Sequence, residues 1–374
     1  TDRESSLSWD TESGGEAKMT DQYGREISYM RLSVTELCNL RCRYCMPAEG
    51  VCKKRHEQML TEDEMIRAVE AASSLGIRKL RITGGEPLVK KNILSICRRA
   101  AAVEGIEEVC LTTNGTLLPE LAKPLKEAGV RRLNIILDTL DRDKYAYITR
   151  IGSLDQAAEG IHAALEAGYD KLKINTVLIG GFNDDEIGEL AELTRRYPLD
   201  LRFIEMMPMY DGGDFGKEMS QYIKQRILEI LKGLELGMGV ETEYFETMTF
   251  PAVVNPGHLA EKALAALRQD ELTAVEPDGG VAKLYRLPGA KGNIGLISPV
   301  NAHFCGSCNR IRLTADGKLK PCLHSSVEYD IKGLDFDGMR SVMEKVIYNK
   351  PAWHGLLDAD NPSHAGRNMN QIGG

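Results

Sequence analysis

Hydrophobic and polar residues alternate in short runs between residues 27 and 207. Amphipathic helical patterns separate these runs. In residues 61–76, Thr61 and Glu64 have the spacing of a capping box, and Gly76 follows the last turn as a stop. The short runs between these helical patterns have the length and the β-branched content of strands. They are YMRLSVT, KLRITG, VCLTTNG, RLNIILD, KLKINTVLI and LRFIEMM.

Six strand–helix units in series predict an α/β fold with a parallel sheet and right-handed crossovers. Such a sheet can curl into an incomplete (β/α)6 TIM-like barrel, with ligands at the carboxyl ends of its strands. After residue 207 the alternation stops, and three further strand-like runs follow, NIGLISPV, RIRLT and KLKPCL. We therefore expect a barrel over residues 21–209 and a smaller C-terminal subdomain over residues 210–374, packed on the barrel mouth.

Composition places the chain among globular proteins. Of its 374 residues 43% are hydrophobic and 27% are charged, and no run approaches the roughly 20 apolar residues of a membrane helix. Residues 1–20 lack the apolar core of a signal peptide and predict a disordered leader, so we expect a cytoplasmic protein. The net charge of -8 argues against a protein that coats nucleic acid. An anionic ligand would need a local group of cations.

Six of the nine cysteines form two groups, which in a reducing compartment indicate metal ligands rather than disulfides. Cys38, Cys42 and Cys45 follow the first predicted strand with the spacing C-x-x-x-C-x-x-C. Three thiolates can hold an iron-sulfur cluster and leave one iron open to another ligand. Zinc would prefer a fourth protein ligand, and no His lies nearby in the sequence. The first group therefore favours an iron-sulfur cluster.

The second group is Cys305, Cys308 and Cys322, with the spacing C-x-x-C-x13-C. His324 could complete a Cys3His zinc site. From the residues alone, structural zinc and a second iron-sulfur cluster both stay open. The other three cysteines, Cys52, Cys97 and Cys110, are interpreted as bystanders.

The first group resembles the hallmark of the radical S-adenosylmethionine (SAM) enzymes, in which an aromatic residue precedes the last cysteine. The resemblance implies that Cys38, Cys42 and Cys45 hold a 4Fe-4S cluster whose open iron chelates SAM. It also implies a SAM-binding loop at TGGEP, where Gly85 lets the backbone approach the ligand and Glu86 meets its ammonium group. The SAM contacts that it implies are Tyr44, Gly85, Glu86, Thr112 and Met207.

The resemblance is closer still to the branch of this family that begins molybdenum cofactor biosynthesis, and it covers about residues 21–374, including the ending MNQIGG. The resemblance implies that Cys305, Cys308 and Cys322 hold a second 4Fe-4S cluster and that the terminal Gly373 and Gly374 reach the active site. The resemblance implies radical cyclisation of GTP to 3′,8-cyclo-7,8-dihydro-GTP. The partners would be GTP, a low-potential electron donor and the next enzyme of the pathway, and a homodimer stays open.

Strand periodicity independently indicates a polyanion. Residues at i and i+2 share a face of a strand, so KLRIT places Lys79 and Arg81 opposite its apolar residues. Cations that point into a barrel need a polyanion or partner carboxylates, because unpaired buried charge is costly. For Arg202 the periodicity is ambiguous, and the assignment rests on the resemblance. The GTP contacts that the resemblance implies are Arg31, Lys79, Arg81, Lys173, Arg202, Arg310 and Arg312, of which Arg31, Arg310 and Arg312 join the first three cysteines as catalytic candidates.

The chain departs from the family pattern at two places. Ile136 stands where the family usually has a serine that contacts SAM, which predicts weaker SAM binding. The stretch 237–270 is longer than expected; it contains the helix-like LAEKALAALRQ and predicts a surface insertion. Two other functions compete: a twin-cluster radical SAM enzyme that modifies a peptide, which would need a less cationic cleft, and a zinc-bound scaffold without chemistry.

Overall fold

The structure is a computed structural model that describes residues 19–207, 209, 215, 218–219, 221–226, 259–267, 272–276, 280–300, 304–355, 357 and 363–373. The predicted leader lies almost wholly outside the described residues. So does most of the predicted insertion, of which residues 259–267 form a helix as expected. No helix in the described part is long and apolar enough to cross a membrane.

All described strands longer than a single bridge belong to one sheet of twelve strands, in the order β12-β11-β10-β1-β2-β3-β4-β5-β6-β9-β8-β7. The eight strands from β10 to β9 are parallel to their neighbours, and β11, β12, β8 and β7 add antiparallel edges. The strands are β1 (Tyr29–Ser33), β2 (Lys79–Thr83), β3 (Glu108–Thr113), β4 (Val130–Ile136), β5 (Leu172–Leu178), β6 (Leu199–Glu205), β7 (Thr273–Val275), β8 (Lys283–Arg286), β9 (Ile294–Ile297), β10 (Arg310–Leu313), β11 (Lys318–Lys320) and β12 (Tyr329–Asp330).

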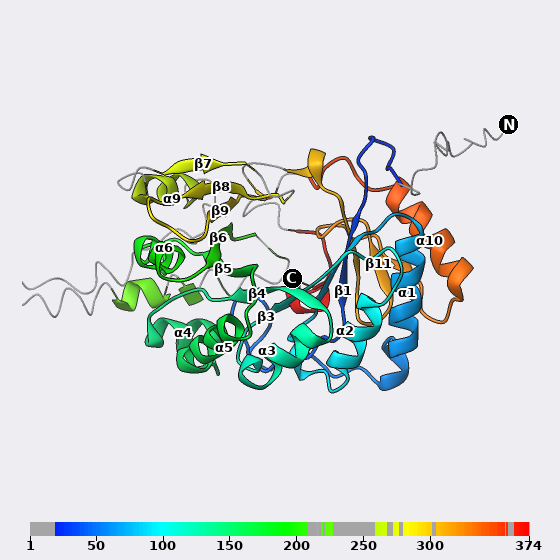
Figure 1. The fold of residues 1–374 in the computed structure, drawn as a ribbon, viewed down its shortest axis with the longest axis horizontal. Coiled ribbons are helices and arrows are strands. Elements are labelled where there is room, and N and C mark those ends of the chain that lie inside the picture. Colours follow the sequence, from blue (N-terminus) through cyan, green and yellow to red (C-terminus); the bar gives the residue numbers. More distant parts are fainter. Residues whose placement is uncertain are drawn as a thin grey trace, which may run out of the picture.

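Helices connect the parallel strands and cover the outer face of the curved sheet (Figure 1). All six predicted barrel strands are confirmed, and so is the predicted first helix. Thr61 accepts from the Glu64 N–H while the Glu64 carboxylate accepts from the Thr61 N–H, which closes the capping box before α1. The α-helices are α1 (Glu62–Ser74), α2 (Ile93–Ala101), α3 (Leu118–Glu127), α4 (Arg142–Thr149), α5 (Leu154–Glu166), α6 (Ile187–Arg196), α9 (Leu259–Leu267) and α10 (Phe336–Tyr348).

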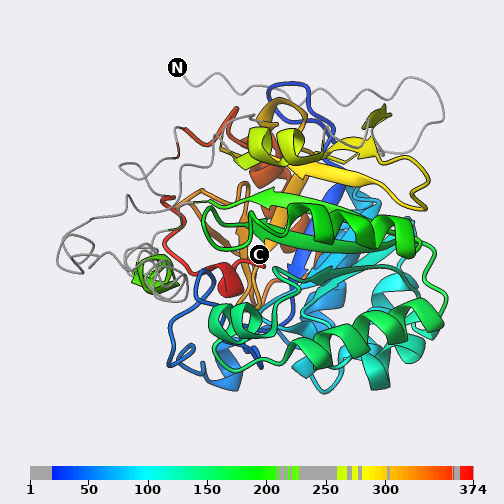
Figure 2. The ribbon, with the colours of Figure 1, turned by 90° about the vertical axis from the view of Figure 1, so that its left-hand side faces the viewer.

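The C-terminal part continues the barrel sheet at both of its edges. Strand β9 pairs with β6 at one edge, and β10 pairs with β1 at the other. Residues 21–209 and the described part of residues 210–374 therefore share one sheet, and a domain boundary at residue 209 stays a prediction. The chain then returns to the concave side of the sheet, where its C-terminal end lies near the centre of the molecule (Figures 1 and 2).

The hydrophobic core lies between the sheet and the helices. On β2, Leu80 and Ile82 are fully buried in this core, whereas Lys79 and Arg81 of the same strand line the cavity on the opposite face. Helix α9 also contributes, because Ala263 and Leu267 are buried. The predicted insertion therefore includes a helix that packs on the barrel rather than one that lies wholly on the surface.

Candidate active site

A cavity of about 370 Å³ lies on the concave side of the sheet. Its lining extends from the first residues of the parallel strands, such as Tyr29 and Lys79, to the loops after their carboxyl ends. Both groups of cysteines line it. Cys38, Cys42 and Cys45 come from the loop after β1, whereas Cys305, Cys308 and Cys322 come from the segments before β10 and after β11. Segments far apart in the sequence therefore bring six thiols to one cavity.

The first cysteine loop is held by the TGGEP segment after β2. The Gly85 N–H donates to the Thr35 carbonyl at 2.7 Å, and the Glu86 N–H donates to the Leu37 carbonyl at 2.8 Å. A Cβ on Gly85 would lie 2.3 Å from the Leu37 carbonyl oxygen. Glycine is thus required here for the approach of two backbone segments, whereas its approach to SAM stays a prediction.

The three thiols of the first group share an environment that favours their neutral form. Burial raises the pKa of Cys38, and it raises the pKa of Cys42 far above its usual value, with Cys45 and Asp138 adding to the effect. Burial, with Cys38 next in size, also raises the pKa of Cys45 to about 12. Only a strongly positive partner can hold such sulfurs as thiolates, and iron is such a partner.

Two carboxyl groups lie beside the first cysteines. The Tyr44 hydroxyl donates to Asp138 at 2.6 Å, and burial raises the pKa of Asp138 to about 6. Glu86 accepts from Thr113 Oγ1 at 2.7 Å and from the Asn114 N–H at 2.7 Å, while burial raises its pKa to about 7. Glu86 thus already fixes the end of β3, and its predicted contact with the SAM ammonium group would use its remaining lone pairs.

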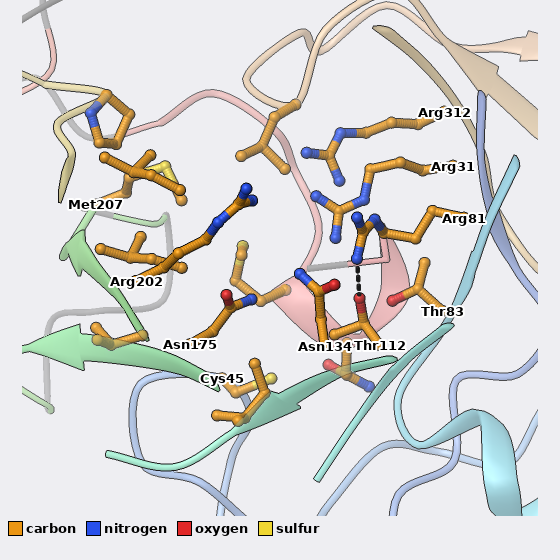
Figure 3. A pocket seen from close by; sticks show the side chains of 18 of the residues that line it. Arg31, Cys45, Arg81, Thr83, Thr112, Asn134, Asn175, Arg202, Met207 and Arg312 are labelled. Atoms are coloured by element: carbon orange, nitrogen blue, oxygen red, sulfur yellow. Dashed lines mark hydrogen bonds between the residues drawn. The ribbon is translucent and has the colours of Figure 1, made fainter. Parts of the chain in front are cut away.

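All five predicted SAM contacts line the cavity. Thr112 also accepts from Arg81 Nη1 at 3.0 Å, so it connects the predicted SAM region to the predicted GTP region (Figure 3). Ile136 lines the cavity as well, which places the departure from the family pattern at the site itself. The binding roles of these residues stay predictions.

Two rows of cations cross the strands on the cavity side. In register, Arg31 of β1 lies between Arg312 of β10 and Arg81 of β2, and the three side chains point into the cavity together (Figure 3). Two residues earlier on the same strands, Tyr29 lies between Arg310 and Lys79. The parallel pairing of β1 with β10 therefore merges cations that are about 280 residues apart into one surface.

These cations destabilise one another in the protein alone. Burial lowers the pKa of Arg31 well below its usual value, and repulsion by Arg312 lowers it further. Burial, followed by repulsion from Arg310, lowers the pKa of Arg312 to about 10. A polyanion in the cavity would relieve this repulsion.

Three of the predicted GTP contacts differ from the others in their position or in their ion pairs. Arg202 lines the cavity from the side opposite Arg31 and Arg81 (Figure 3). Ile204, which shares a face of β6 with Arg202, also lines the cavity. Lys79 pairs with Glu108 at 2.5 Å. Lys173 is buried and pairs with Asp200 at 3.2 Å, but it is not among the residues that line the cavity. The structure therefore brings six of the seven predicted cations to the cavity.

The sequence analysis missed several polar residues of the cavity. Arg132 and Asn134 share the inner face of β4, and Arg132 pairs with Glu108 at 2.9 Å. Tyr29 on β1 and Asn175 on β5 are also inward. The same i, i+2 periodicity that was applied to the cations could have found all four. Cys110 does not line the cavity, and Arg132 Nη2 lies 3.4 Å from its sulfur; its interpretation as a bystander stays a prediction.

The C-terminal tail reaches the cavity. Arg312 Nη1 donates to the carbonyl of Gly373 at 2.7 Å and to that of Ile372 at 3.2 Å. Asn370 Nδ2 donates to the Glu36 carbonyl at 2.9 Å, next to the first cysteine loop. Gly373 is thus fixed at the site, whereas Gly374 lies outside the described residues.

The second cysteine group has a different environment. Burial raises the pKa of Cys305, but for Cys308 the nearby Lys350 and Arg310 outweigh burial and lower the pKa. His324 lines the cavity too; burial and the neighbouring His354 lower its pKa to about 3, and its Nδ1 lies 2.8 Å from Ser363 Oγ. In the described part of the chain, no three His, Cys, Asp or Glu side chains are placed to hold one metal ion. A four-iron cluster binds its thiolates at separate irons and does not need them to converge.

Matches to protein families define the class of protein. Residues 32–194 match the Radical SAM superfamily, and residues 240–356 match Molybdenum Cofactor Synthesis C. The fold is similar to that of Streptococcus suis SuiB bound to S-adenosylmethionine, with a TM-score of 0.55, 13% identity, and coverage of 88% of this chain and 68% of SuiB. This chain is a radical SAM enzyme, and the class implies a 4Fe-4S cluster and SAM.

Relatives narrow the class to one family. A GTP 3′,8-cyclase of Alkaliphilus oremlandii is 44% identical to this chain, and the match covers 95% of this chain and 100% of the relative. A GTP 3′,8-cyclase of Moorella thermoacetica is 41% identical, with coverage of 95% and 100%. The chain belongs to the GTP 3′,8-cyclase family.

Proposed function

We propose that this chain cyclises GTP to 3′,8-cyclo-7,8-dihydro-GTP, the first step of molybdenum cofactor biosynthesis. The observation that carries the proposal is that two groups of three thiols and six buried or half-buried cations line one cavity. Three thiols per group suit a 4Fe-4S cluster with one open iron, and the cations suit a triphosphate. Family membership agrees with both features.

Cys38, Cys42 and Cys45 would hold the first cluster, and Cys305, Cys308 and Cys322 would hold a second one. When bound, the first cluster and SAM would supply the electron and the carbon radical needed to take hydrogen from C3′ of GTP. A low-potential donor would supply the electrons, and the next enzyme of the pathway would take the product. The open iron of the second cluster would hold the guanine.

The chain's own residues would orient the substrate. Arg31, Arg81 and Arg202 have planar donor groups that suit phosphate oxygens, and Arg202 faces the other two across the cavity (Figure 3). If these arginines hold the triphosphate, C3′ of GTP would lie against SAM and C8 of the guanine would lie within reach of C3′. This is catalysis by orientation. Arg312 and the tail that it holds would close the site against water.

Anaerobic reconstitution tests the proposal. We expect about eight irons per chain, as two 4Fe-4S clusters require. Incubation with SAM, dithionite and GTP should yield 5′-deoxyadenosine and a cyclised guanine product, whereas ATP should yield neither above background. SAM cleavage that is indifferent to GTP would contradict the proposal and favour another substrate, such as a peptide.

Ile136→Ser is expected to strengthen SAM binding about fivefold, because one added hydrogen bond contributes about 1 kcal/mol. Ile136 lines the cavity beside the predicted SAM contacts. Equilibrium dialysis of SAM against the reconstituted protein measures the effect. Ile204→Ser adds the same hydroxyl to another cavity strand and serves as the control. Equal affinities of the wild-type protein and Ile136→Ser would contradict the account.

Tyr29 is expected to make GTP binding weaken at alkaline pH. Burial alone would raise its pKa, but Arg81, Arg31 and Arg310 outweigh burial and lower the pKa to about 8, although Cys110 opposes them. Above that pH the phenolate adds a negative charge among the cations. Because bound triphosphate would favour the neutral phenol, GTP affinity should fall as the pH rises through about 8.

The dissociation constant of GTP between pH 7 and pH 9.5 measures this effect. Tyr29→Phe cannot ionise, so its GTP affinity should change little over the range. A parallel fall in both proteins would assign the pH dependence to another group.

A further inference from the structure

Lys350 follows α10 and points its ammonium group into the wall of the cavity beside the second cysteine group. The side chain is only 2% exposed, and it lines the cavity. Its Nζ donates to the carbonyl of Arg310 at 2.8 Å and to that of Pro321 at 2.6 Å. Arg310 lies two residues after Cys308, and Pro321 directly precedes Cys322. One ammonium group therefore joins the two segments that carry these cysteines.

The third cysteine segment is tied to the same place through Arg25. Arg25 Nη1 donates to the carbonyl of Cys305 at 2.7 Å, and Nη2 donates to the carbonyl of Pro351, next to Lys350, at 2.7 Å. Asp21 fixes the guanidinium through an ion pair at 2.6 Å. Lys350 and Arg25 thus connect the backbones around Cys305, Cys308 and Cys322.

The charge of Lys350 has no carboxylate counterpart in the described part of the chain. Both of its hydrogen-bond acceptors are neutral backbone carbonyls. The buried Lys144 shows the usual solution, since it pairs with Asp185 and Glu186, each at 2.7 Å. A buried ammonium group without an anion is costly, so an anion is expected next to Lys350. The sulfurs of Cys308 and Cys322 can supply this anion as thiolates, because the two carbonyls that Lys350 holds belong to the segments that carry them.

We infer that Lys350 is a positioning residue of the second cluster: its ammonium group holds the Cys308 and Cys322 segments together and balances the negative charge of their thiolates and of the cluster. The inference rests on the second 4Fe-4S cluster of the proposed function. Charge next to a cluster sets its reduction potential. A cation stabilises the more negative, reduced state, so Lys350 should raise the potential of the second cluster.

The clusters should also differ from each other for the same reason. Two carboxyl groups lie next to the first cysteine loop: Asp138 accepts from Tyr44, and the backbone of Glu86 is hydrogen-bonded to that of Leu37. The second group instead lies next to the ammonium group of Lys350, which holds the carbonyls of Arg310 and Pro321. The second cluster should therefore be the easier one to reduce. Loss of Lys350 should reduce this difference.

The experiment uses the full chain with Cys38, Cys42 and Cys45 replaced by alanine, so that bound iron reports only the second site. In this background Lys350→Gln keeps hydrogen-bond donors without charge, Lys350→Met removes both, and Lys350→Arg keeps the charge. Anaerobic iron and sulfide analysis and reductive titration followed by electron paramagnetic resonance are the readouts. Lys144→Met is the matched control, because it removes a buried lysine that does not line the cavity.

With Lys350 intact, we expect about four irons per chain. Gln and Met should move the midpoint potential to more negative values, Met should also lower the iron content, and Arg should restore both readouts. Lys144→Met should change thermal stability without moving the potential. If the folded Lys350→Gln and Lys350→Met variants kept the full iron content and the same midpoint potential, the role of Lys350 would be overturned, but the proposed second cluster would not. No iron, or zinc in its place, with Lys350 intact would overturn both this role and the proposed second cluster.

Discussion

Cys45→Ser is expected to abolish SAM cleavage by the reconstituted protein. Cys45 lines the cavity from the loop after β1. A serine hydroxyl is a poor ligand for iron in place of a thiolate, and the proposed first cluster would have only three protein ligands. The loss of activity should exceed the roughly 100-fold that changes outside the ligand shell cause at most.

The matched control for this prediction is Cys52→Ser. Cys52 is exposed and lies in the same region of the sequence, but it is absent from the cavity lining. Its replacement should leave both 5′-deoxyadenosine formation and iron content unchanged. The Cys45 variant should lose the iron of one cluster and keep the fold, as circular dichroism would show. Wild-type rates in the Cys45 variant would refute the assignment of the first cluster.

The sequence was sufficient to predict the parts of the fold that depend on local patterns. The six barrel strands are patterns of five to seven residues, and Thr61 with Glu64 marks the start of α1. The pairing of β10 with β1 was not predictable in this way, because it depends on packing between residues about 280 positions apart. That pairing is what places Arg312 beside Arg31 and joins the second cysteine group to the cavity.

Local sequence patterns likewise predict some residues of the candidate site but not others. The cations of β1 and β2 follow from alternation, which could also have indicated Tyr29 and Arg132. Lys350 lies just after a helix, where no periodicity predicts the direction of a side chain, so only the structure shows its position. For Glu86 the sequence motif indicates only part of what the side chain does. Its motif predicts a ligand contact, but the structure adds hydrogen bonds to Thr113 and Asn114 that no motif indicates.

Arg312→Gln is expected to lower GTP-dependent turnover by about 100- to 1,000-fold, the range for loss of one fixed donor at a reacting group. Arg312 is central by two observations: it lies in register with Arg31 and Arg81, and it holds the carbonyls of Ile372 and Gly373. Glutamine keeps a polar side chain but loses the charge and the fork geometry. Product formation from GTP, measured beside iron content and GTP-independent SAM cleavage, separates catalysis from cluster loss.

A second variant that ends at Ile372 tests whether Arg312 acts through the tail. If its main role is to hold Gly373, truncation should cost about as much as Arg312→Gln, and the double variant should cost little more, since the two changes remove one shared contact. If Arg312 instead contacts the substrate independently, the two losses should multiply. Arg142→Gln, which removes an exposed arginine paired with Asp155, is the control and should leave turnover unchanged. Wild-type turnover in Arg312→Gln would exclude both roles, because neither the charge nor the tail contact would then matter to the reaction.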